Sequence, residues 1–112
     1  MLIVKVWCLP KMSEEQSKTL FSGIVAAAVS TKWLGVKSES GILCLFPPDA
    51  MSYGLGSEIL IEISGVSTRA RQEMTPEALA EKIGAPVHSM FPRAKVTSHV
   101  LEDIIAGGWR SR

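Results

Sequence analysis

A strand, a helix and a second strand follow one another twice along this chain, and this repeated order is the feature that most limits its fold. In the first half the strands around Ile3 and Leu43 flank a helical stretch. In the second half the strands around Leu60 and Val100 do the same, at the same separation in sequence. Identity between the halves is low, so the repeat is one of pattern and does not demonstrate a duplication.

The repeat predicts a fold class. A chain of 112 residues is long enough for one domain, here over residues 1–112, with pseudo-repeats at about 1–50 and 57–112. Parallel strands joined by a helix require a right-handed crossover, which places both helices on the same face of the sheet. We therefore expect an α+β two-layer sandwich, with two helices over one face of a four-stranded mixed sheet.

The helices carry recognisable start signals. Ser13 and Gln16 form a capping box at the start of the first helix. Gly35 is its expected end, with fraying at residues 31–33 as the alternative. Thr75 is the expected N-cap of the second helix, with proline at its first position. Pro86 is expected to kink this helix or to split it after Gly84.

The strands have different patterns. Residues 2–8 alternate, and residues 42–46 are all apolar, as in a strand covered on both faces. Residues 58–64 alternate, with isoleucines on one side, as in a half-buried strand. Residues 94–101 form the fourth expected strand. Residues 65–71 are interpreted as a connecting segment.

The second face of the sheet has nothing left to cover it. It carries Leu43, Leu45 or Cys44, and Leu60, and the chain offers no further element for that side. An exposed apolar sheet face favours self-association.

Composition excludes several classes. Hydrophobic residues make up 46% and the net charge is +1, which gives no electrostatic reason to expect nucleic acid or a membrane surface. Cys8 and Cys44 are too few for a disulfide scaffold and lack metal-ligand spacing, so we expect no metal site. No apolar run reaches the roughly 20 residues of a membrane span. We expect a soluble, cytoplasmic protein without a cofactor.

Residues 48–58, Pro-Asp-Ala-Met-Ser-Tyr-Gly-Leu-Gly-Ser-Glu, resemble a segment of macrophage migration inhibitory factor and its relatives in the tautomerase superfamily. Lys37 before a strand, Lys95-Val96 at the start of the fourth strand and Gly108-Trp109 in the tail are also similar. The resemblance implies tandem β-α-β units assembled as a homotrimer. It also implies catalysis by an amino-terminal proline.

This sequence departs from the family at its first residues. Position 2 is Leu2 and not proline, and a bulky second residue disfavours removal of the initiator methionine. An α-amino group has an ordinary pKa of about 8, which partial burial lowers towards neutrality. The Met1 amine could therefore still accept a proton or form a Schiff base, but it lacks the ring nitrogen of proline.

The resemblance assigns roles to further residues. Lys37 resembles the family lysine that holds the substrate's carboxylate or carbonyl, whereas the sequence alone is equally consistent with a solvated lysine. Arg69 and Arg71 fall where some relatives place arginines that grip a carboxylate, although such a pair is more often on the surface. His99 falls at a position that lines the neighbouring subunit's pocket, and Thr97 replaces an aromatic residue; a lone strand histidine is usually structural or exposed.

Two functions remain open. The first is a tautomerase-superfamily protein with weak, altered or lost keto–enol isomerase activity on a small 2-keto or enol carboxylate, with Met1 and Lys37 as catalytic residues. The second is a non-enzymatic, trimeric binding or interaction protein of the same fold. A monomer of ferredoxin-like fold and unrelated function is a third interpretation, which requires the open sheet face to be polar.

Overall fold

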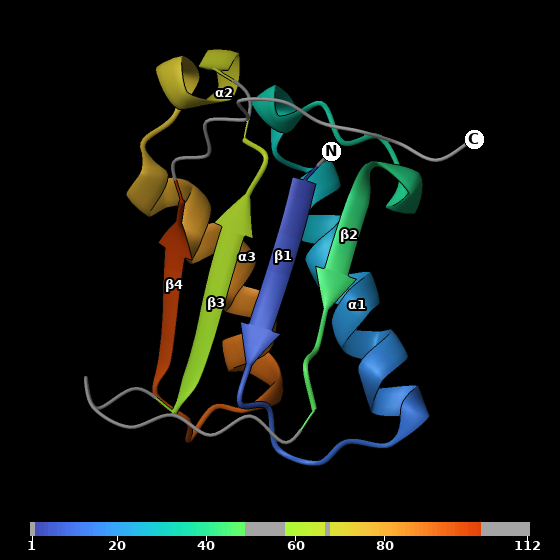
Figure 1. Cartoon of the computed structure of the whole chain (residues 1–112). Coiled ribbons are helices and arrows are strands. Elements are labelled where there is room, and N and C mark those ends of the chain that lie inside the picture. Colours follow the sequence, from blue (N-terminus) through green and yellow to red (C-terminus); the bar gives the residue numbers. More distant parts are fainter. Residues whose placement is uncertain (1, 49–57, 67, 102–112) are drawn as a thin grey trace.

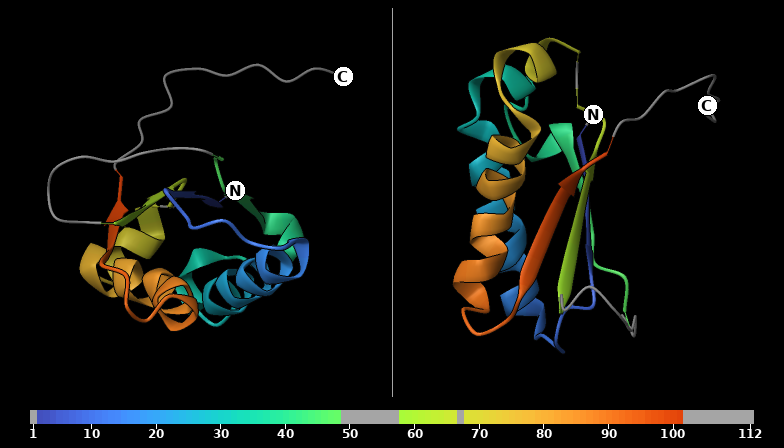
Figure 2. Two further views of the ribbon diagram at one scale, coloured as in Figure 1. Left: turned by 90° about the horizontal axis from the view of Figure 1, so that it is seen from below. Right: turned by 90° about the vertical axis from the view of Figure 1, so that its left-hand side faces the viewer.

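The computed structural model describes residues 2–48, 58–66 and 68–101, which form a sheet with helices on one face (Figures 1 and 2). In chain order the elements are β1 (Leu2–Trp7), α1 (Glu14–Val29), the 3₁₀ turns η1 (Lys32–Leu34) and η2 (Glu39–Gly41), β2 (Ile42–Leu45), β3 (Ile59–Ser64), α2 (Thr68–Glu73), α3 (Pro76–Met90) and β4 (Val96–Val100). This arrangement confirms the α+β fold class.

The sheet has the strand order β2-β1-β3-β4. Within each half the two strands are parallel, β1 with β2 and β3 with β4, and the halves meet through the antiparallel pair of β1 and β3. Helices α1 and α3 lie side by side on one face, as right-handed crossovers require (Figure 2). The sheet is therefore mixed, as the sequence predicts.

Helix α1 begins as its sequence predicts and ends earlier. The Ser13 hydroxyl accepts a hydrogen bond from the Gln16 N–H, and the Gln16 side chain accepts one from the Ser13 N–H. At the other end the buried Thr31 donates its hydroxyl to the Ala27 carbonyl at 2.8 Å. Gly35, in the left-handed region with φ 73°, ends η1 and not α1.

Helix α3 begins at Pro76 behind the Thr75 cap, as expected, but of the two outcomes predicted at Pro86 the split after Gly84 is wrong. The helix continues to Met90. Pro86 packs against Gly23 of α1 so closely that a Cβ on Gly23 would lie 3.2 Å from the Pro86 Cβ. The helix therefore contains a proline at its contact with α1, although the ring removes one hydrogen bond from that turn.

The core lies between the sheet and the two long helices. The alternation in β3 is confirmed, because Ile59, Ile61 and Ile63 are buried against the helices. Strand β1 alternates in the same way. The other fully buried large side chains come from β1, α1 and α3: Val4, Val6, Leu20, Ile24, Leu79, Ile83 and Val87.

Strand β2 was subject to two predictions. Its continuous apolar run predicts cover on both faces, whereas the number of elements predicts an open face that carries Leu43 with Leu45 or Cys44. The second prediction agrees with the described residues, among which Leu43 is 41% and Leu45 is 39% exposed. Along β2 the two leucines alternate with the buried Ile42, so they lie on the face opposite the helices, which Figure 2 shows.

Among the residues that the structure describes, no helix is both long and apolar enough to cross a membrane. The predicted loop over residues 49–57 and the tail over residues 102–112 lie outside the described residues.

Candidate functional site

One end of the sheet brings together segments that are far apart in the sequence. β1 begins there with Leu2, which pairs with Ile42 at the start of β2. β3 ends there, because Ser64 pairs with Ile3 in the antiparallel register. Helix α2 follows β3 at the same end (Figure 1). We call this region the β1-start end; the candidate catalytic residue Met1, adjacent to Leu2, lies outside the described residues.

Lys37 lies in the segment that enters this end of the sheet. On one side Val36 is buried and lies within 3.5 Å of the position that a Cβ on Gly41 would take. On the other side the Ser38 hydroxyl accepts a hydrogen bond from the Ser40 N–H and caps η2. The backbone at Lys37 is therefore anchored on both sides, whereas its side chain is exposed. A positioned, solvent-facing ammonium group can attract an anionic ligand.

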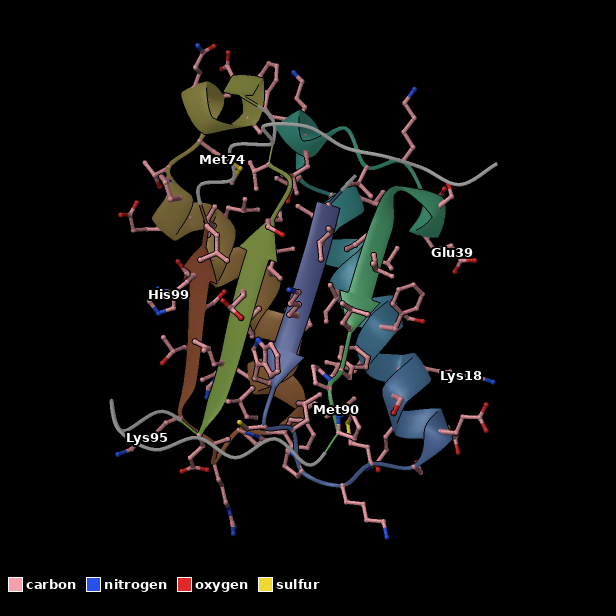
Figure 3. The ribbon with its side chains drawn as sticks, viewed as in Figure 1. Lys18, Glu39, Met74, Met90, Lys95 and His99 are labelled. Atoms are coloured by element: carbon pink, nitrogen blue, oxygen red, sulfur yellow. The ribbon has the colours of Figure 1, made fainter. Side chains whose placement is uncertain are left out.

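Arg69 and Arg71 lie on a helix and not in a connecting segment, which corrects the sequence interpretation. Their backbone belongs to α2, whose central Ala70 is completely buried. Helix α2 contacts η1, the turn that precedes Lys37, so the structure brings these two segments together. Met74 lies just beyond α2, at the same end of the molecule (Figure 3). A short helix held by one buried alanine lacks the long periodic pattern by which helices are identified from sequence.

His99 and Thr97 are not brought to the β1-start end within this chain. Both lie on β4 at alternate positions and therefore on the same face of the sheet. His99 is exposed on the open face (Figure 3). In the strand register His99 lies opposite Glu62 of β3. Thr97 lies opposite Leu60, and Leu60 lies opposite Trp7 at the far end of β1. Any role for these two residues at the β1-start end requires a second copy of the chain.

The structure also identifies polar residues that the sequence interpretation did not single out. Lys5 of β1 lies directly opposite Glu62 of β3 in the strand register, on the open face. The Trp7 indole N–H donates a hydrogen bond to the Glu62 carboxylate. The one sequence signal for this cluster is alternation, which puts Lys5 and Trp7 on the same side of their strand.

The described residues form a groove elsewhere, of about 750 Å³, between α3 and β4. Its lining includes Gly84 and Ser98 but none of the six residues proposed from sequence. The Ser98 hydroxyl is buried there without a hydrogen-bond partner among the described residues. The groove is also lined by Lys95 and His88, together with Glu77 and Glu81. It lies away from the β1-start end, where the resemblance places the catalytic amine, so we do not assign the chemistry to it.

The two cysteines are free and half-buried. Cys8 follows β1 in the left-handed backbone region, with φ 66°. Cys44 lies on β2 and packs against the core. Burial raises the pKa of the Cys44 thiol from 9.0 to about 11. A thiol with a raised pKa is a poor nucleophile near neutral pH.

We expect Cys44 to react slowly with iodoacetamide. Because the thiolate is the reactive form and the Cys44 pKa is about 11, its alkylation rate should rise about tenfold from pH 8 to pH 9. The rate is measured by mass spectrometry of the Cys44 peptide, with the urea-unfolded chain as the control. Equal rates in the folded and unfolded chains at pH 8 would contradict this assignment.

Solved structures share this fold at low sequence identity. MIF2 from Leishmania major superposes with a TM-score of 0.68 at 10% identity, over 90% of this chain and 87% of that one. An R7 fused 4-OT, described as an asymmetric trimer, gives 0.65 at 16% identity, over 91% and 85%. A malonate semialdehyde decarboxylase gives 0.62 at 15%, over 98% and 91%.

No protein-family model matches the sequence, and no curated protein matches it. The likeness to solved structures therefore concerns the fold, and at that level it confirms the fold that the sequence resemblance implies.

Proposed function

We propose that this chain is a self-associating member of the tautomerase superfamily. It binds a small 2-keto or enol carboxylate at the β1-start end, and its keto–enol isomerase activity is weak compared with that of proline-bearing relatives. One observation carries the proposal: in a fold shared with fused 4-OT and MIF proteins, the start of β1, the anchored Lys37 segment and α2 meet at one end of the sheet.

The chemistry needs a base and a cation. In keto–enol exchange a base removes a proton from the carbon next to the carbonyl, and a positive group stabilises the negative oxygen that forms. In this proposal the Met1 amine is the base, and the Lys37 ammonium holds the carboxylate or enolate oxygen. Arg69 and Arg71, whose backbone belongs to α2, are the further cations that the proposal assigns to the carboxylate. The weakness of the activity follows from the missing proline, because the Met1 amine is primary and acyclic and lacks the ring nitrogen of the family's base.

Self-association is supported by the open face. Leu43, Leu45 and Leu101 are exposed large hydrophobic residues, and each lies on or next to the strands of that face. Burying such a face stabilises an assembly by roughly 25 cal/mol per Å² of apolar surface. The fused 4-OT structures are described as trimers, and we propose the same state here.

A non-enzymatic binding protein is the second candidate, and one observation favours it. Leu2, which stands where the family has its proline, is only 3% exposed and pairs with Ile42. This residue therefore serves the core. Keto–enol exchange of phenylpyruvate separates the two functions: exchange that is lost on acetylation of the amino terminus supports the enzyme, and no exchange at all supports the binding protein.

Lys37→Ala should weaken the binding of phenylpyruvate about tenfold. A charge-assisted hydrogen bond to a carboxylate contributes about 1.5–3 kcal/mol, and solvent at this exposed side chain lowers that value. Isothermal titration calorimetry measures the change in Kd.

Lys32→Ala is the matched control. Lys32 lies five residues earlier, in η1, where its Nζ is 4.9 Å from the Trp33 ring centroid. The variant removes the same charge from the same region and should leave Kd within about twofold of the native value. Equal effects of the two substitutions would show that only general electrostatic attraction is involved.

A further inference from the structure

The open face of the sheet carries one charged row between apolar ones. This row consists of neighbours in the strand register: Leu45 on β2, Lys5 on β1, Glu62 on β3 and His99 on β4. We call this set the polar row. It crosses the face that α1 and α3 leave uncovered (Figure 2).

The neighbouring rows are mostly apolar. Towards the β1-start end lie Leu43, Ile3 and Ser64, and Leu101 follows β4 beside them, 37% exposed. Towards the other end lie Trp7, Leu60 and Thr97. A face of this kind has the anatomy of an interface, with apolar patches around a few polar groups that fix register.

The Glu62 carboxylate accepts a hydrogen bond but has no salt-bridge partner among the described residues. The Trp7 indole donates to one of its carboxylate oxygens, which fixes the side chain on the face. Among the described residues, Glu14 and Lys18 on α1 form the salt bridge between a carboxylate and an ammonium group. Lys5 and Glu62 therefore do not form a salt bridge with each other within the chain. Both charges are therefore free to pair with groups on another molecule.

We infer that the polar row is the recognition element between copies of this chain, with Lys5 of one copy pairing with Glu62 of the next. The inference rests on the self-association proposed above. A second copy is the fitting partner because the row contains both signs of charge, so that Lys5 of each copy can meet Glu62 of its neighbour around a closed ring of copies. The flanking leucines also need an apolar cover. Charged pairs of this kind select the partner and the register.

The experiment uses Lys5→Glu and Glu62→Lys, alone and mixed. Each variant alone places like charges opposite each other and should raise the dissociation constant of self-association about tenfold or more. An equimolar mixture restores opposite charges between copies but not within either chain. We expect particles that contain both chains, detected by native mass spectrometry with one variant labelled with ¹⁵N. Their dissociation constant should lie between those of the native chain and of either variant alone, because a mixed trimer restores opposite charges at two of its three contacts.

Two further variants separate the possible causes. Lys18→Glu makes the same charge change on the helix layer and should leave assembly unchanged. Glu62→Gln keeps the acceptor for Trp7 and removes the charge, so it should weaken assembly without loss of the fold, measured by circular dichroism. Assembly of all variants like the native chain, or a mixture that forms no joint particles, would overturn the inference. A native chain that is monomeric would instead overturn the proposed self-association itself.

Discussion

Leu2→Pro should exchange phenylpyruvate between its keto and enol forms about a hundredfold faster than the native chain does. A small second residue permits removal of the initiator methionine and exposes a proline amine at the β1-start end. A positioned general base contributes about 10²–10⁴ in rate. The lower figure applies because the native chain already has a base in this proposal, the Met1 amine. The rate is followed by ultraviolet absorbance, and mass spectrometry verifies that Met1 has been removed.

The matched control is Leu2→Ala. It also permits methionine removal and it also truncates a side chain that is 3% exposed, so it should lose a similar 2–4 kcal/mol of stability. It leaves a primary amine in place of the ring nitrogen. Faster exchange in the proline variant alone would assign the gain to the ring nitrogen. No gain in either variant, with both chains folded, would mean that the β1-start end does not hold the substrate.

Ile61→Ala should lower the free energy of unfolding by about 4 kcal/mol. Ile61 lies at the centre of β3, is completely buried against the helices, and would leave a cavity that the packed layers cannot fill. A domain of this size is stable by about 5–15 kcal/mol, so the variant should unfold at much lower urea concentration. Urea titration followed by circular dichroism measures the change.

Leu60→Ala is the comparison, because it removes a similar side chain from the same strand on the other face. Leu60 is half-buried, so its truncation should cost about 1 kcal/mol in the dissociated chain. At concentrations where copies associate, the cost should grow if the open face is an interface. Equal losses for the two variants in the dissociated chain would contradict the two-layer arrangement of the core.

Local sequence signals accounted for much of the fold. The capping box from Ser13 to Gln16, the Thr75 cap and the alternation through Ile61 all describe interactions between residues close together in the chain. Such interactions operate wherever the segment is placed, so they can be identified without knowing the rest of the structure.

The predictions that failed concern contacts between residues far apart in the chain. Helix α3 continues through Pro86, which packs against Gly23 of α1, and the helix at α2 has a completely buried Ala70 at its centre. Both segments pack against parts of the chain that are distant in sequence, and local patterns contain no information about such partners.

By itself, the sequence determined the fold class and the faces of the strands, because the strand–helix–strand order and the spacing of apolar residues constrain both directly. Only the tertiary structure decided the strand order, and with it which residues meet. The antiparallel pairing of β1 with β3 places the start of one beside the end of the other, so that Lys37 and α2 share the β1-start end. The same pairing aligns Lys5 with Glu62 and His99 across the open face, because register is set between strands and not within them.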